Sequence, residues 1–232
     1  MLTLVLIYNL ISNSIKLAKV RLLLSLFCFS ITSIITAQET KYGAKLGFNY
    51  SSIVGDLTEG LKFRFSGHGG IFVETEINQK FAIKSELLYS SQGFQFSSDL
   101  ESIENNEMTL DQTDFRTNVQ LNYLTLPVLG KFALSNVLYI EFGPQFGFLL
   151  NQVTKIRNLN QADNIVSDNR NTISGNFRLD YGAAAGLDIK INNKFSVAPR
   201  FYIGLRNRLN EFAGNLQNYN LAIQLSAAYL FL

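Results

Sequence analysis

Cysteine, histidine, proline and tryptophan are all scarce in this chain. It contains one Cys, one His, three Pro and no Trp. Cys28 lies in an N-terminal stretch that we expect to be removed, so the mature chain has no thiol for a disulfide, a metal site or nucleophilic catalysis. One histidine and scattered carboxylates do not form a metal-ligand pattern either. We therefore expect no metal and no cofactor.

Charged residues are few as well. They make up 16% of the chain, whereas soluble domains average about 25%. The 20 Lys and Arg residues nearly balance the 18 Asp and Glu residues. Proteins that bind nucleic acid carry a clear basic surplus, so we expect no nucleic acid among the partners.

Residues 1–37 have the order of an export signal. Three basic residues between positions 16 and 21 precede an apolar run at 22–35, and small residues place a cleavage site after Ala37. The mature chain, 38–232, is then a single barrel domain with 17 basic and 18 acidic residues. The alternative is a transmembrane helix, because the apolar run is of borderline length for spanning a bilayer.

Apolar and polar side chains alternate strictly along much of the mature chain. Near its end, Ile223 and Leu225 alternate with Gln224 and Ser226. Such alternation predicts a long strand with one apolar and one polar face. Strands of soluble proteins usually have about 5–6 residues, whereas tilted membrane strands need about 9–11. Eight long strands are predicted, at 42–51, 64–76, 81–93, 119–134, 138–150, 177–191, 195–206 and 218–232.

The connections between these strands alternate between long and short. Long polar segments at 52–63, 94–118, 151–176 and 207–217 are separated by tight turns. Outer-membrane barrels show this asymmetry, with longer external loops and short periplasmic turns. We therefore predict an all-β fold, an eight-stranded antiparallel up-and-down transmembrane β-barrel of the outer-membrane type.

The apolar face also fixes the register of the hairpins. Opposite residues of an antiparallel pair share a face, which places Glu74 across from Lys84 and Lys131 across from Glu141. Both pairs should point into the lumen and form ion pairs. The three tight turns then have three residues each, at 78–80, 135–137 and 192–194.

Most of the remaining charges fall on the same inward face. An eight-stranded barrel has an interior that side chains just fill, and buried charges must be paired. We therefore interpret these residues as a structural salt-bridge network, with a selective channel or binding site as the alternative. The predicted network comprises Lys45, Glu74, Lys84, Glu86, Lys131, Glu141, Arg178, Asp180, Asp188 and Arg200, and His68, Glu76, Lys190 and Arg206 share its face.

Aromatic residues cluster at the predicted strand ends, as in the two interfacial girdles of membrane barrels. The expected loop-side girdle contains Tyr50, Phe65, Tyr89, Phe94 and Phe148. The expected turn-side girdle contains Phe81, Phe132, Tyr139, Phe195, Tyr229 and Phe231.

No enzymatic signature accompanies His68. A catalytic histidine needs a nucleophile and an orienting group within reach, and no Gly-x-Ser-x-Gly pattern is present. The glycines around His68 do not have the spacing of a dinucleotide fingerprint. We expect no catalytic, cofactor-binding or metal-binding residues and no enzyme activity.

Five stretches of the mature chain point to a known family, namely 81–93 (FAIKSELLYSSQG), 121–132 (LNYLTLPVLGKF), 140–150 (IEFGPQFGFLL), 180–188 (DYGAAAGLD) and 195–205 (FSVAPRFYIGL). They resemble the PorT-like outer-membrane β-barrel family of Bacteroidetes. The resemblance implies a Gram-negative outer-membrane location, contact with outer-membrane lipid, and insertion by the barrel-assembly machinery. It also implies envelope or secretion proteins as candidate partners. Thr125 departs from the family, which more often has an acidic residue there.

Three functions are consistent with this sequence. The first is a non-enzymatic outer-membrane barrel with a filled lumen that acts through its external loops or as a partner of envelope or secretion machinery. The second is a small solute pore or a ligand-binding barrel. The third is a soluble, lipocalin-like periplasmic carrier, in which the apolar residues would line a cavity and the charged residues would face water.

Overall fold

The computed structural model describes residues 39–56, 58–98, 115–158, 164–171, 178–208 and 216–231. The predicted export signal and the cleavage site after Ala37 lie outside these ranges. Within the described ranges, no helix is long and apolar enough to cross a membrane. The strands of these ranges are β1 (Thr40–Gly55), β2 (Leu61–Asn78), β3 (Phe81–Ser98), β4 (Phe115–Ala133), β5 (Leu138–Asn158), β6 (Asn164–Asn171), β7 (Leu179–Lys190), β8 (Phe195–Gly204) and β9 (Asn218–Leu230).

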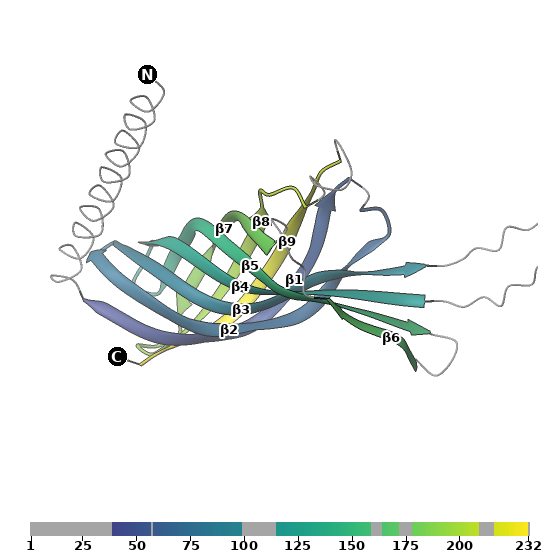
Figure 1. The fold of residues 1–232 in the computed structure, drawn as a ribbon. Coiled ribbons are helices and arrows are strands. Elements are labelled where there is room, and N and C mark those ends of the chain that lie inside the picture. Colours follow the sequence, from purple (N-terminus) through teal and green to yellow (C-terminus); the bar gives the residue numbers. More distant parts are fainter. Residues whose placement is uncertain are drawn as a thin grey trace, which may run out of the picture. The chain divides into compact units, whose positions relative to one another are not determined.

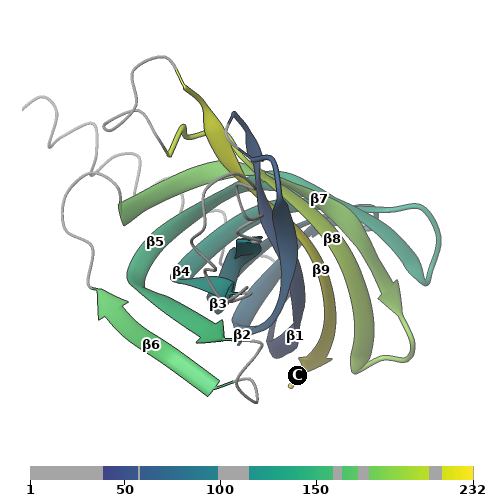
Figure 2. The same cartoon turned by 90° about the vertical axis from the view of Figure 1, so that its right-hand side faces the viewer.

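Eight of these strands close into an antiparallel ring (Figures 1 and 2). Neighbours in the chain are neighbours in the ring, with β5 followed by β7, and β9 returns to pair with β1. That closing pair runs without a break from Gly43 opposite Leu230 to Gly55 opposite Asn218. The ring therefore has no free edge, and the predicted eight-stranded antiparallel barrel is confirmed.

A ninth strand, β6, lies outside the ring. It falls in the segment 151–176, for which the sequence predicts a long loop. β5 pairs with β7 as far as Phe148 opposite Leu179, and its loop-side half then pairs with β6. Figure 1 shows β3, β4, β5 and β6 continuing together beyond the shorter β7 and β8. The sequence of this hairpin is polar and lacks an alternating apolar face, so periodicity does not identify it.

The predicted hairpin register is confirmed along the strands, but it shifts at the turn between β2 and β3, where Asn78 lies opposite Phe81. Glu74 lies opposite Lys84, and Lys131 lies opposite Glu141. In each turn the first residue closes the loop with its side chain. The Asn78 and Asn192 Oδ1 atoms accept hydrogen bonds from the backbone N–H groups two and three residues ahead, at 2.8–3.0 Å. Ser135 Oγ does the same at 3.1–3.3 Å in the remaining turn.

The two faces of the barrel wall are oriented as predicted. On β9, Ile223 and Leu225 are 49% and 53% exposed, whereas Gln224 and Ser226 are 3% exposed. The apolar side chains therefore point outward and the polar ones inward. A soluble carrier would have the reverse arrangement, so this orientation excludes the lipocalin-like alternative.

Two of the predicted girdle residues point elsewhere. Phe94 is half-buried and packs against an internal apolar cluster that includes Leu121 and Leu149. Tyr139 has the strand parity of Glu141, and its ring lies between the ammonium groups of two lysines inside the barrel. Other expected girdle residues form aromatic pairs. Phe65 stacks on Phe48, which was not among the predicted girdle residues, and tilted cross-strand pairs join Phe81 to Phe132 and Phe195 to Tyr229.

Candidate functional site: the ion-paired lumen

Eight charged side chains cross the lumen as one chain of alternating sign. They come from seven of the eight ring strands, and each is 4% exposed or less. Four are cations and four are anions, so this group, called the lumen chain below, has no net charge. In order, its members are Lys45, Glu86, Arg200, Glu141, Lys84, Asp188, Lys131 and Glu74.

Arg200 is the centre of this lumen chain. Its Nη1 and Nη2 atoms donate to the two carboxylate oxygens of Glu86 at 2.7 and 2.9 Å. Nη2 also donates to Glu141 Oε2 at 2.7 Å. Lys45 completes the arrangement by donating to Glu86 Oε1 at 2.9 Å. Forked guanidinium–carboxylate contacts of this kind are among the strongest hydrogen bonds in proteins.

Two lysines carry the lumen chain toward the turn-side end. Lys84 Nζ lies 2.9 Å from Glu141 Oε1 and 3.2 Å from Asp188 Oδ2. Lys131 Nζ lies 2.8 Å from the same Asp188 oxygen and 2.8 Å from Glu74 Oε2. Asp188 therefore bridges two cations, and every carboxylate of the lumen chain has at least one cationic partner.

The four residues of the predicted ion pairs have the predicted register, but they pair with one another in a different combination. Lys84 pairs with Glu141 of β5 and not with Glu74 opposite to it, and Lys131 pairs with Glu74 of β2. In both cases the partner strand is two positions away in the ring. Because the lumen of an eight-stranded barrel is narrow, a long lysine side chain reaches across it.

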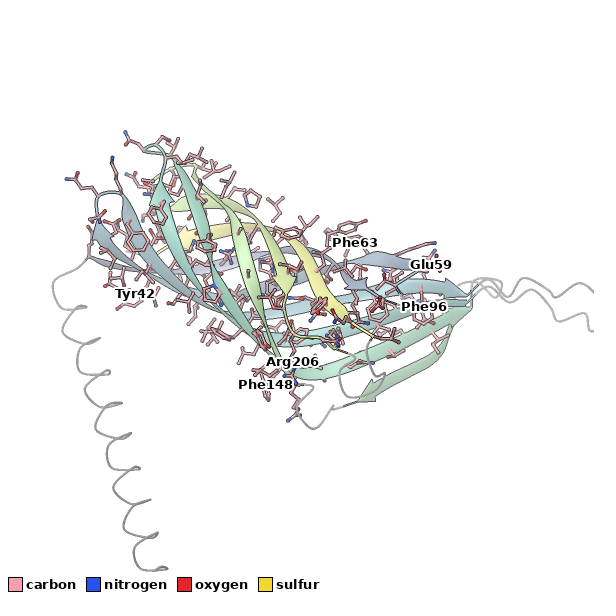
Figure 3. The ribbon with its side chains drawn as sticks, turned by 90° about the horizontal axis from the view of Figure 1, so that it is seen from above. Tyr42, Glu59, Phe63, Phe96, Phe148 and Arg206 are labelled. Carbon is pink, nitrogen blue, oxygen red and sulfur yellow. The ribbon has the colours of Figure 1, made fainter. Side chains whose placement is uncertain are left out.

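The two other predicted network residues lie away from the lumen chain, toward the loops. Arg178 lies over the ring of Phe148, with 5.4 Å between the guanidinium carbon and the ring centroid. Figure 3 labels Phe148 and Arg206 near each other at this rim, far from Tyr42 at the turn side.

Asp180 belongs to a second buried polar group. Its Oδ2 atom accepts hydrogen bonds from the Tyr202 hydroxyl at 3.0 Å and from Asn220 Nδ2 at 2.7 Å. Asn220 Nδ2 also donates to the Tyr123 hydroxyl, which in turn contacts Arg208. Sequence reasoning identified Asp180 but none of these partners, which come from β4, β8, β9 and the segment after β8.

His68 is the centre of a third polar group that sequence reasoning missed. Its Nδ1 lies 2.8 Å from Asn49 Oδ1, and its Nε2 lies 2.8 Å from Ser226 Oγ. Because Asn49 Oδ1 can only accept, Nδ1 carries the proton, and in the neutral ring Nε2 accepts from the serine hydroxyl. Gln224 Nε2 also donates to Asn49 Oδ1 at 3.0 Å.

Ser226, His68 and Asn49 thus have the hydrogen-bond order of a catalytic triad, but their surroundings do not suit one. All three side chains are buried, at 3%, 6% and 0% exposed. Ser226 pairs with β1 on one side and β8 on the other, so the backbone amides beside it belong to strand ladders and not to an oxyanion hole. The group is best explained as a polar layer that satisfies its own hydrogen bonds.

Metal ligation finds no support in the described part of the chain. No group of three or more His, Cys, Asp and Glu side chains converges there. The carboxylates of the lumen chain are already bound by Lys or Arg.

Comparison with known proteins finds several solved structures of bacterial proteins that are similar to this chain. Among solved structures, Ail, the attachment invasion locus protein of Yersinia pestis, is 14% identical, with 83% of this chain and 99% of that chain covered and a TM-score of 0.42. Neisserial surface protein A is 8% identical, with 82% and 98% covered and a TM-score of 0.44. OprG from Pseudomonas aeruginosa is 10% identical, with 84% and 97% covered and a TM-score of 0.33.

No curated protein sequence matches the chain. A family model described as outer membrane protein beta-barrel domain matches residues 36–210, which is most of the chain. The closed ring, the outward apolar face and the ion-paired lumen are the features expected of that class. The chain belongs to the outer membrane protein β-barrel domain family and is an outer-membrane protein.

Proposed function

We propose that this barrel is a non-enzymatic, closed membrane anchor that acts at its ends, as a partner of other envelope or secretion proteins, and not as a pore. The observation that carries the proposal is the lumen chain of eight ion-paired residues. It joins side chains from seven ring strands and leaves no member without an oppositely charged partner.

The space left beside the lumen chain supports a closed barrel. The cavity lined by Lys84, Lys131 and Asp188 has a volume of about 10 Å³, which is at the limit for a single water molecule. A conducting path would have to separate buried ion pairs, and breaking one such pair costs about 3–5 kcal/mol. Solute passage is therefore disfavoured.

The loop-side extension is the surface on which we expect a partner to dock. β3, β4 and β5 continue past the point where β7 and β8 end, and β6 adds a further strand to them (Figure 1). Loops that a rigid barrel positions in this way commonly carry function. The resemblance to the PorT-like family supports envelope or secretion machinery as the class of partner, with the barrel-assembly machinery acting during insertion.

Planar-bilayer recordings test the closed lumen. The purified barrel, shown to be folded by its heat-modifiable migration on gels, should give no conductance steps. An Arg200→Ser/Glu86→Ser/Glu141→Ser variant, which removes the centre of the lumen chain, serves as the matched control and should conduct or flicker. Reproducible steps from the unmodified barrel would show that it is a pore.

The buried serine provides a separate test of the non-enzymatic assignment. Because Ser226 is enclosed and has no oxyanion hole, a fluorophosphonate probe should not label the folded barrel. Labelling that disappears in both Ser226→Ala and His68→Ala variants would instead identify an active hydrolase. Labelling that persists in Ser226→Ala would point to a different residue and leave the Ser226 assignment intact.

A further inference from the structure

A cavity lies at the turn-side end of the lumen, which in this class of barrel faces the periplasm. Its volume is about 360 Å³, which falls within the range of small-ligand pockets. Side chains from β1, β2, β7 and β9, from the turn between β7 and β8, and from the residue after β9 line it. They are Lys41, Glu74, Lys190, Asn193, Lys194, Leu230 and Phe231.

The charges around this turn-side cavity do not balance. Glu74 is neutralised by Lys131, whose Nζ lies 3.0 and 2.8 Å from its two oxygens. Lys41 is paired with Glu76 at 2.5 Å. The Lys190 ammonium group, by contrast, has only Tyr139 as a polar partner among the described residues, donating to its hydroxyl at 2.7 Å and lying 4.5 Å from its ring centroid.

Lys194 adds a second cation without a counter-charge. It occupies the third position of the turn between β7 and β8, lines the cavity, and forms no ion pair within the described barrel. The neighbouring lumen chain is neutral, whereas Lys190 and Lys194 give this cavity a surplus of two positive charges. A partly enclosed surplus of cations is most stable when an anion occupies the site.

We infer that the turn-side cavity binds a small phosphate-bearing molecule from the periplasm, with Lys190 and Lys194 as its ligands. Two ammonium groups act as point charges and suit the oxygens of a phosphate group. The apolar side chains of Leu230 and Phe231 form the other part of the wall and suit a non-polar substituent. This site lies at the opposite end from the loop-side surface, so it is independent of the role proposed there.

Titration calorimetry with inorganic pyrophosphate tests this inference. The mature barrel should be folded in octyl glucoside, because phosphocholine detergents carry the phosphate group that is being tested. We expect saturable binding that weakens as salt is added. Each Lys→Gln substitution at positions 190 and 194 should weaken it by roughly tenfold, as expected for a hydrogen bond to a charged group.

Lys80→Gln is the matched control. Lys80 occupies the same third position in the turn between β2 and β3 and does not line the cavity, so its loss should leave the affinity unchanged. Lys190→Arg keeps the charge and should retain binding. Absence of binding by the folded barrel would overturn the inference, as would equal affinity in Lys80→Gln and a Lys190→Gln/Lys194→Gln variant.

Discussion

Replacing Arg200 with methionine should lower the free energy of unfolding of the barrel by about 3–5 kcal/mol, the usual cost of removing one partner from a buried ion pair. Arg200 is 3% exposed and supplies three hydrogen bonds to Glu86 and Glu141. Methionine has a similar length, so the lost charge and not a cavity dominates the effect. Both carboxylates would keep only their lysine partners in a nearly dry environment.

The chain has no tryptophan, so urea unfolding should be followed by far-ultraviolet circular dichroism. Arg206→Met is the control, because Arg206 lies at the loop-side rim and donates only to the Leu179 carbonyl among the contacts described. It should cost about 1 kcal/mol or less. Adding Glu86→Gln and Glu141→Gln to Arg200→Met should restore much of the stability. Equal losses for Arg200→Met and Arg206→Met would mean that the lumen chain does not stabilise the barrel.

The wall of the barrel could be predicted from sequence because its rules are local. A strand alternates its side chains between two faces, so the alternation of apolar and polar residues predicts that Ile223 points outward and Gln224 inward. The same parity fixed the three turn lengths, and through them the positions of Glu74 and Lys84. Asn or Ser at the first turn position then closes each turn by a hydrogen bond within three residues.

The interior could not be predicted because its contacts depend on ring closure. Asn49 and Gln224 are opposite each other only because β1 pairs with β9, and no turn connects these strands. His68 then meets Ser226 across 158 positions of sequence. Strand tilt and stagger decide which side chains face each other across a barrel, so parity alone identified the lumen charges without their partners.

The wrong predictions for Phe94, Tyr139 and β6 also have physical causes. Phe94 and Tyr139 lie near strand ends, where an aromatic residue suits either a girdle or the interior, and their parity points inward. β6 pairs through backbone groups in a polar segment, so it leaves no hydrophobic signal. At both places strand geometry, and not residue composition, decides where the side chains and the backbone lie.

An arginine in place of Ile223 should destabilise the barrel by about 2–4 kcal/mol, the cost of a charge on the lipid face near the bilayer midplane. Ile223 is near the middle of β9, with Tyr50 of β1 and Phe201 of β8 as its cross-strand neighbours. Its side chain points away from the lumen, so the guanidinium would have to reach the interface or draw water into the bilayer.

Two matched variants are measured by the same urea unfolding in lipid vesicles. They separate the effect of depth in the bilayer from the effect of the side of the barrel wall that carries the residue. Tyr229→Arg places the charge at the turn-side interface and should cost about 0–1 kcal/mol. Gln224→Asn changes the inward neighbour, which is 3% exposed and donates to Asn49, and should cost about 1 kcal/mol, as for one hydrogen bond. If Gln224→Asn were more costly than Ile223→Arg, the outward face would not contact lipid. The depth dependence of the arginine cost is therefore the direct measurement of where the membrane meets this barrel.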